Sequence, residues 1–289
     1  MRAESFSFMT QTSGETAFPV VRIQPTSNVF ALNFRELWEY RELLYFLVWR
    51  DVKVRYKQTV IGAAWAIIQP VMTMVVFSIF FGSLAKIPSD GLPYPIFFYS
   101  ALLPWTYFAQ ALTSTTNSMV DNQRLITRVY FPRVILPLAA ALTGVVDFVI
   151  AFSVLLLMLV WYGVMPSLAV VLIPFFFLLT VVTALGVGLW LAALNAMYRD
   201  VRYTLPFLIQ FWMFASPVVY PSSLVPIQWQ WLYGLNPMAG VISGFRWALT
   251  GVGQPPGVLF AASAVAMVII FVGGLFYLHR MEEAIVDAV

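Results

Sequence analysis

Three cationic side chains stand just before the first long apolar stretch of this chain: Arg50, Arg55 and Lys57. An arginine guanidinium offers two parallel hydrogen bonds to a phosphate, and a lysine adds a compact positive charge. These residues could therefore hold the phosphate of a lipid substrate at an entrance on the membrane edge. Arg41 and Arg55 fall on an otherwise apolar helix face, so extension of their side chains to bulk lipid phosphates is the alternative.

One acidic residue, Asp147, lies within the long apolar stretches. A carboxylate there costs about 2.5–3.5 kcal/mol to insert, so it should face protein or water. Hydrogen bonding to a serine or threonine of a neighbouring helix and a role in transport both stay open. A proton-coupled carrier would need a relay of several such groups, and no inverted internal repeat is evident.

Sequence signatures of catalysis are missing. The chain has no GxxxxGK[ST] loop, no GxSxG, no HExxH and no cluster of carboxylates. Cysteine is absent, which excludes disulfides and thiolate metal sites. The one histidine, His279, ends the last apolar stretch and is expected at the membrane interface. The sequence predicts a passage that is not an enzyme and binds no metal or cofactor itself.

A second basic stretch, residues 121–133 (DNQRLITRVYFPR), separates two apolar segments. Residues 123–130 are predicted to form two helical turns that offer Leu125, Ile126 and Val129 to a groove, and Pro132 cannot continue a helix. If transport is driven, energy must enter through a cytoplasmic partner. A helix seated in a cleft of a soluble ATPase could transmit a rigid-body motion. A solvated loop is the alternative.

Membrane-spanning helices must position these groups. The chain has 289 residues, of which 61% are hydrophobic and 10% charged, against roughly 25% charged in soluble domains. A spanning helix needs about 20 apolar residues. A shorter sixth candidate, 204–220, precedes a proline-broken stretch, 221–256, that must be shielded by protein or lie at the surface. The five longer candidates are residues 60–84, 94–120, 134–162, 168–195 and 257–279.

The basic residues orient the chain. Six spans place both termini on one side, and that side holds every lysine and arginine except Lys86 and Arg246. This bias is the positive-inside pattern, so both termini are predicted to be cytoplasmic. The domain boundaries follow: a mobile cytoplasmic tail at 1–34, a transmembrane domain at 59–280 and a cytoplasmic C-terminus at 281–289.

Residues 35–58 are predicted to form an amphipathic helix lying in the membrane interface. At 100° per residue, one face is charged and the opposite face is mostly apolar. The charged face carries Arg35, Glu36, Glu39, Glu42, Arg50, Lys53 and Lys57. The apolar face carries Leu37, Trp38, Leu44, Tyr45, Val48, Trp49, Val52 and Tyr56.

Five motifs in order closely resemble a known family of membrane proteins. The family is that of the permease subunits of polysaccharide-exporting ABC transporters, the type-2 exporters of O-antigen, capsule or teichoic acid. The resemblance runs from about Arg35 to the C-terminus. The motifs are RDVKVRYKQTVIGAAWAIIQP (50–70), FYSALLPWTYFAQAL (98–112), RLITRVYFPRVILPLA (124–139), YRDVRYTLPFLIQFWMFASPVVYP (198–221) and LNPMAGVISGFRWAL (235–249).

The resemblance implies a homodimer of permeases with two nucleotide-binding subunits, which carry ATP and Mg²⁺. An entrance loop would end at Ile61 and Gly62, where the family commonly has Leu-Gly, and 221–250 would form short external re-entrant or gate helices. Residues 121–133 would be the coupling helix. Its contact residues would be Asp121, Gln123, Arg124, Leu125, Ile126, Arg128, Val129, Tyr130, Phe131 and Arg133.

Aromatic residues make up 17% of the chain. Sugar rings stack on aromatic faces, so two groups of them could line a pore or gate. Aromatic belts at the two membrane interfaces are the alternative. The first group is Trp105, Tyr107, Phe108, Phe211, Trp212 and Phe214, and the external group is Tyr220, Trp229, Trp231, Tyr233, Phe245 and Trp247.

The expected protein is thus an all-α membrane protein with six spans, an interface helix, a coupling helix and external gate helices. The resemblance implies that it exports a lipid-linked polysaccharide across the bacterial inner membrane. An ABC permease for a small lipid or drug is the runner-up. A membrane enzyme acting on polyprenyl-linked sugars and a secondary carrier are the rival classes.

Overall fold

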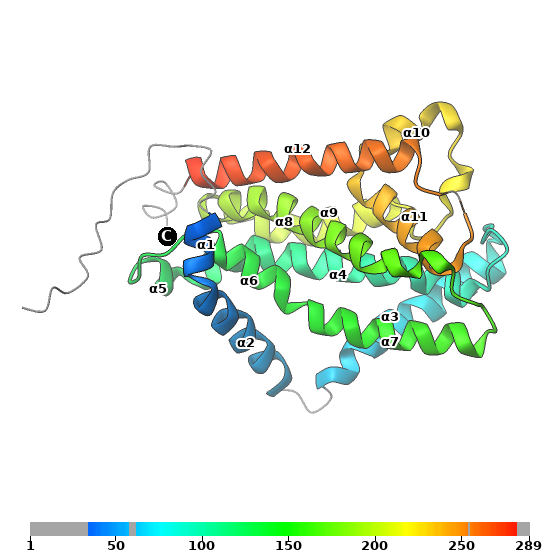
Figure 1. Cartoon of the computed structure of the whole chain (residues 1–289), viewed down its shortest axis with the longest axis horizontal. Helices are drawn as coiled ribbons and strands as arrows, with labels where there is room; N and C mark the ends of the chain where they lie inside the picture. The colour runs from blue at the N-terminus through cyan, green and yellow to red at the C-terminus, as the bar shows by residue number, and fades with distance from the viewer. Residues whose placement is uncertain (1–33, 58–61, 254, 282–289) are drawn as a thin grey trace, which may run out of the picture.

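The computed structural model describes residues 34–57, 62–253 and 255–281. All regular structure in these residues is helical, as expected, and the helices form an elongated bundle (Figure 1). Outside the described part lie most of the predicted tail (residues 1–33), residues 58–61, which include Ile61 of the predicted entrance loop, and residues 282–289. The elements are α1 (Phe34–Glu39), α2 (Arg41–Lys57), α3 (Gly62–Phe77), the π-helix η1 (Ser78–Leu84), α4 (Tyr94–Asp121), α5 (Gln123–Ile126), α6 (Ile135–Thr143), α7 (Val145–Trp161), the 3₁₀ helix η2 (Leu168–Leu172), α8 (Ile173–Met197), α9 (Asp200–Phe214), the 3₁₀ helix η3 (Ser222–Leu224), α10 (Ile227–Tyr233), α11 (Pro237–Thr250) and α12 (Val258–Arg280).

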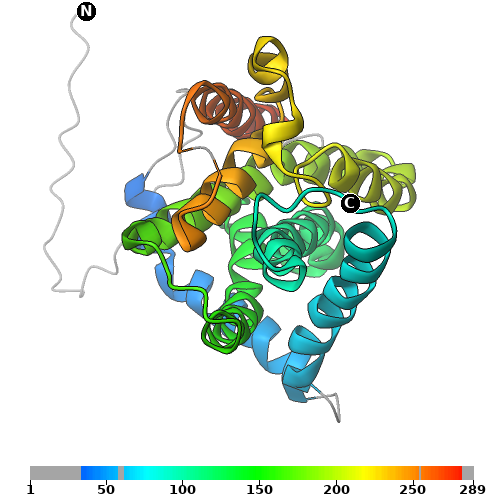
Figure 2. The ribbon, with the colours of Figure 1, turned by 90° about the vertical axis from the view of Figure 1, so that its right-hand side faces the viewer.

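The helix α4 forms the centre of the bundle (Figure 2). Most of its residues are buried, and it contacts α3, α6, α7, α8, α9 and α11. Its side chains include many serines, threonines and amides, which lower its mean hydropathy. Neighbouring helices cover it, so it needs no lipid-facing apolar surface.

Four helical segments in the described residues are long and apolar enough to cross a membrane. They are Ala64–Leu84, Ile135–Trp161, Leu168–Met197 and Val258–Arg280. Two further segments expected to span, 94–120 and 204–220, correspond to α4 and α9. The first is long but more polar, whereas α9 has only 15 residues. Neither meets the same criterion on its own.

Gly144 separates the third predicted span into two helices, α6 and α7, which are offset in Figure 1. The backbone hydrogen bonding of α6 stops at Thr143, and α7 restarts at Val145. This break places Asp147 in the first turn of α7. The position suits a carboxylate because the N-terminal end of a helix carries partial positive charge.

Helices α8 and α12 pack closely because small residues face each other. A Cβ on Gly274 would lie 2.6 Å from the carbonyl oxygen of Gly186. A Cβ on Gly186 would lie 3.0 Å from the Cα of Phe271. Since both neighbours are backbone atoms, neither can rotate away. Small residues commonly allow this close approach between membrane helices.

Replacing Gly274 with alanine is expected to push α12 away from α8 and to lower the free energy of unfolding by about 1–3 kcal/mol. The measurement is the thermal unfolding midpoint of the purified protein. Ala261→Val is the matched control, since it adds methyl groups on an exposed part of α12. Equal losses for the two variants would contradict the close contact.

The interface helix differs from its expected form in two ways. It is interrupted at Tyr40, between α1 and α2. Its protein-facing side also includes Leu47, which is 2% exposed, and the half-buried Arg50, assigned above to the charged face. Trp38, Tyr45 and Trp49 remain exposed. The prediction of one apolar face opposite one charged face was therefore wrong. Part of α2 packs on α6, while its aromatic residues face outward.

The stretch 221–256 contains a buried arginine. In α11, Arg246 is 5% exposed, and its Nη2 donates to the carbonyl oxygens of Phe97 at 3.3 Å and Pro217 at 3.1 Å. Its Cζ lies 3.8 Å from the centroid of the Phe97 ring. Asn236 caps the start of α11 through Met238 N–H, at 3.1 Å. Thus α11 is held against α4 and the segment after α9.

Arg246→Met is expected to lower the free energy of unfolding by about 2 kcal/mol. The Pro217 carbonyl oxygen loses the arginine donor, while the Phe97 carbonyl oxygen keeps the donation from Ser100 Oγ. Thermal unfolding of the purified protein measures the loss. Arg280→Met is the control, as Arg280 is exposed at the end of α12. A midpoint unchanged by Arg246→Met would show that the carbonyl contacts contribute nothing.

Candidate functional site

A cavity of about 1140 Å³ lies between the end of α2 and helices α3, α4, α7 and α9. We call it the central cavity. Its lining combines hydrogen-bonding groups with aromatic rings, a mixture suited to a polar ligand that has apolar faces. The polar lining residues are Arg55, Tyr56, Gln69, Thr73, Thr106, Gln110, Thr113, Ser114, Asp147 and Gln210. The aromatic ones are Tyr56, Trp65, Phe77, Trp105, Tyr107 and Phe148.

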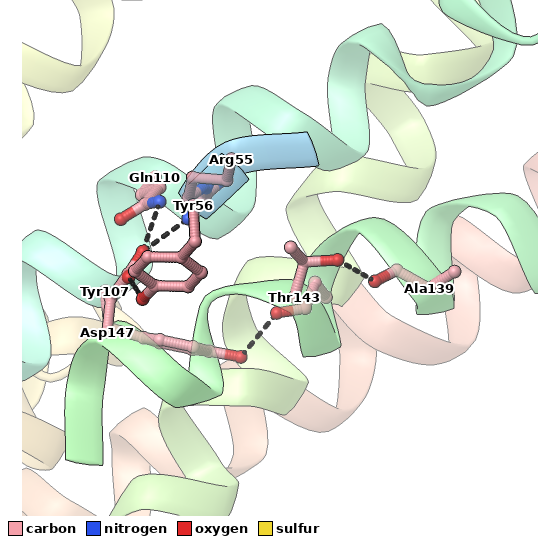
Figure 3. Close-up of polar contacts among 8 residues, drawn as sticks. Arg55, Tyr56, Tyr107, Gln110, Ala139, Thr143 and Asp147 are labelled. Atoms are coloured by element: carbon pink, nitrogen blue, oxygen red, sulfur yellow. Dashed lines mark hydrogen bonds and ion pairs between the residues drawn. The ribbon is translucent and has the colours of Figure 1, made fainter. Parts of the chain in front are cut away.

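Three side chains converge on the carboxylate of Asp147 (Figure 3). Arg55 forms an ion pair with Oδ2 through Nη1, and the hydroxyl of Tyr56 donates to Oδ1. Gln110 Nε2 also donates to Oδ2, at 3.0 Å. The cluster joins three helices. Arg55 and Tyr56 belong to α2, Gln110 belongs to α4, and Asp147 belongs to α7.

The Arg55–Asp147 pair is partly shielded from water, with side-chain exposures of 33% and 16%. Asp147 faces protein, as expected. The expected serine or threonine partner is wrong, since a guanidinium, a phenol and an amide hold the carboxylate instead. Burial, reinforced by the hydrogen bond to Asp147, raises the pKa of the Tyr56 hydroxyl. Tyr56 therefore stays protonated and remains a donor.

A second hollow of about 570 Å³ lies between α2, α4 and α6 and reaches the α4 end beside α5. We call it the crevice. Arg50 lines it, with its Nε 2.8 Å from Asp51 Oδ1 and its Nη2 3.1 Å from Asn122 Oδ1. The crevice and the central cavity share Arg55 among their lining residues, together with Thr113 and Ser114. The Arg55–Asp147 pair thus stands where the two spaces meet.

The proposed entrance residues separate into distinct positions. Arg50 lines the crevice and Arg55 lines both spaces, whereas Lys57 is exposed at the end of α2. Gly62 begins α3, and Ile61 lies outside the described residues. Arg50 and Arg55 therefore both line the crevice.

The stretch 121–133 is only partly helical. Its regular helix is the single turn α5, although Leu125 O still accepts from Arg128 N and Val129 N at 3.3 and 3.1 Å. The expected two turns were too long, and Ile126 is buried rather than available to a groove. Phe131 is also buried, and Gln123, Leu125 and Arg133 are half-buried. The exposed members of the expected contact set are Asp121, Arg124, Arg128, Val129 and Tyr130.

Ile126 and Phe131 pack into a core cluster that also contains Leu47 of α2, Leu189 of α8 and Leu278 of α12. The 121–133 stretch is therefore packed against several long helices at once. This packing explains why its apolar side chains point inward. The exposed surface of the stretch combines charged side chains with Val129 and Tyr130.

The aromatic residues named as pore candidates do not act as one group. Trp105 and Tyr107 line the central cavity, and Tyr107 donates to the Ala141 carbonyl oxygen at 2.9 Å. Phe108 is buried against Trp212, while Phe211 and Phe214 are exposed away from this lining.

In the external group, Phe245 is fully buried. Tyr220 and Tyr233 share a hydrogen bond of 3.0 Å between their hydroxyls, and Trp247 is half-buried. Trp229 and Trp231 are exposed. Trp212, Trp229 and Tyr233 line a small hollow of about 420 Å³.

The sequence analysis did not single out several polar residues of the central cavity. Gln69, Gln110 and Gln210 come from three different helices and lie in apolar surroundings. An amide within a predicted span could have marked them, because lipid-facing amides are unfavourable. In the residues that the structure describes, no group of three or more His, Cys, Asp or Glu side chains could hold a metal ion.

Long apolar helices around a polar cavity, with ionisable groups facing inward, define a multi-pass membrane protein of the transport class. Comparison with known families makes the assignment specific. The family model described as ABC-2 type transporter matches residues 42–250, and the chain belongs to this family. As a permease subunit of an ABC transporter, it is the transport component and not the ATPase.

Curated relatives cover most of the chain. An O-antigen export system permease protein RfbA from Myxococcus xanthus is 30% identical over 253 residues, covering 86% of this chain and 96% of the relative. A protein of the same name from Klebsiella pneumoniae is 28% identical over 206 residues, covering 71% and 79%. The polysialic acid transport protein KpsM from Escherichia coli is 24% identical over 246 residues, covering 83% and 93%.

Proposed function

We propose that this permease exports a lipid-linked polysaccharide from the cytoplasm across the bacterial inner membrane. Two copies of the chain would assemble with two ATPase subunits. The names of the relatives support the substrate class, since they describe permeases for O-antigen and polysialic acid. The family supports the ATPase partner.

The proposed arrangement has six membrane crossings. They are α3 with η1, α4, α6 with α7, α8, α9 with the residues after it, and α12. In Figure 1, α1 and α5 lie at one end of the bundle and α10 lies at the other. Among the described residues, every lysine and arginine except Lys86 and Arg246 belongs to α1, α2, the stretch 121–133, residues 199–202 or the end of α12. This distribution supports a cytoplasmic location for the α1 and α5 end and for both termini. Residues 221–250 then form the external gate.

The central cavity is the observation that carries the proposal. A hydrated glycan needs hydrogen-bonding groups along its path and aromatic faces for its sugar rings. The cavity offers both, with Gln69, Gln110 and Gln210 beside Trp105 and Tyr107. Its volume of about 1140 Å³ in one copy already exceeds the roughly 300–1,000 Å³ of typical small-molecule pockets.

The basic end of α2 supports a lipid carrier that bears phosphate. Arg50 and Arg55 line adjoining spaces, and Lys57 is exposed beside them. Such a carrier would bring its headgroup to this end while its sugars enter the path between the two copies.

Deleting the gene is expected to leave a lipid-linked glycan inside the cell, and mass spectrometry of extracted lipids would identify it. ATP-dependent transport by the purified permease should require the ATPase subunit. Transport by the permease alone under an ion gradient would overturn the proposal. Accumulation of a small lipid or drug without any glycan would favour the alternative, an ABC permease for a small lipid or drug.

A further inference from the structure

The positive charge of Arg55 already has an anionic partner inside the protein. Asp147 pairs with it, and the same carboxylate accepts from Tyr56 and Gln110. An anion that enters from the crevice or the cavity therefore meets a guanidinium that is occupied. To bind Arg55, it must compete with Asp147.

We propose that Asp147 is an internal stand-in for the substrate's phosphate, and that an arriving lipid-linked phosphate takes its place on Arg55. The exchange would release the contact between α2 and α7 and open the crevice to the central cavity. This inference rests on the proposed function, because it concerns how the same entrance selects and admits its substrate.

The exchange is physically balanced. A phosphate carries at least the charge of a carboxylate and more acceptor oxygens, so it matches the arginine fork well. The displaced Asp147 keeps the Gln110 donor of α4 and its place in the first turn of α7, where the helix dipole favours a negative group. Neither of these depends on α2, so α2 can move without leaving the carboxylate unsupported.

The competition also gives selectivity. A lipid with a neutral headgroup supplies no charge to replace Asp147, so the pair stays closed. Asp147 would therefore be a specificity-determining residue that weakens phosphate binding and lets the site reset after release. Removing its charge should strengthen phosphate binding rather than weaken it, which a purely structural role does not predict.

The test compares binding of polyprenyl phosphate and polyprenol to the complete transporter in nanodiscs of phosphatidylcholine. Asp147→Asn removes the charge and keeps one acceptor oxygen, which can serve either Tyr56, the donor to Oδ1, or Gln110, a donor to Oδ2. We expect at least about fivefold tighter binding of polyprenyl phosphate and unchanged binding of polyprenol. Asp200→Asn is the matched control, because it removes an exposed carboxylate from the start of α9 and should leave both affinities unchanged.

A second measurement keeps Arg55 and Asp147 intact. The chain has no cysteine, so Lys53→Cys and Val149→Cys can carry two spin labels at exposed sites on α2 and α7. Labelled permease is mixed with excess unlabelled permease, so that most dimers contain a single labelled copy. The measured distance then joins the two labels within that copy. Polyprenyl phosphate should shift the label distance to longer values, and polyprenol should not.

The outcomes separate the two ideas. A wild-type transporter without preference for the phosphate over the alcohol would overturn the phosphate entrance itself, and this inference with it. A clear preference that Asp147→Asn leaves unchanged, or an unchanged label distance with phosphate bound, would overturn the exchange alone. Lengthening by inorganic phosphate alone would assign the site to a free anion and overturn the lipid part.

Discussion

Arg55→Glu is expected to abolish polysaccharide export while the permease still inserts into the membrane. The variant places a second carboxylate against Asp147 and removes the cation that would meet the phosphate. Removing one partner of a fully buried ion pair costs about 3 kcal/mol of folding free energy. The cost is smaller here because Arg55 is 33% exposed and Asp147 16% exposed. Export is measured as cell-surface glycan, and the amount of permease in the membrane is measured alongside it.

Two further variants separate charge from packing. Arg55→Lys keeps the positive charge without the fork and should retain part of the export. The exchange of Arg55→Asp with Asp147→Arg restores an ion pair between α2 and α7, so stability should recover. Surface glycan at the wild-type level in Arg55→Glu would remove Arg55 from the entrance.

Loss of ATPase binding is expected when the exposed side chains after α5 are changed. Val129→Asp together with Tyr130→Ala removes two side chains that are 51% and 65% exposed. Central contact residues of an interface typically contribute about 2–4 kcal/mol each, so the affinity for the ATPase should fall at least about thirtyfold. Co-purification of the two subunits measures it.

Trp161→Ala is the control for this pair, because Trp161 is 86% exposed and ends α7 away from α5. It should leave ATPase binding unchanged. Crosslinks from Arg128→Cys in the naturally cysteine-free chain should reach the ATPase as well. Wild-type co-purification of the double variant, without any crosslink from residue 128, would show that the stretch 121–133 does not contact the ATPase.

The inward packing of Ile126 gives these predictions a mechanical basis. Because Ile126 and Phe131 share a core cluster with Leu47 of α2, motion at α5 can reach the helix that carries Arg55. ATPase motion and substrate binding would then act on the same helix from two sides.

Local sequence patterns predicted much of the fold. Long apolar runs gave the approximate places of α3, α8 and α12. These patterns gave wrong predictions where the packing of neighbouring helices decides which residues are buried. The interface helix broke at Tyr40, and the face of α2 that became buried includes Arg50. A helical wheel shows which residues share a face, but it does not show which face meets protein and which meets lipid.

The sequence by itself determined that the chain is a membrane protein and that Asp147 needed a partner, and it predicted one membrane side for most basic residues. Only the tertiary structure decided that this partner is Arg55, 92 residues earlier. The physical reason is that local periodicity specifies each helix separately. The pairing of Arg55 with Asp147 depends on how α2, α4 and α7 pack, and that packing follows from side-chain shapes along the whole bundle.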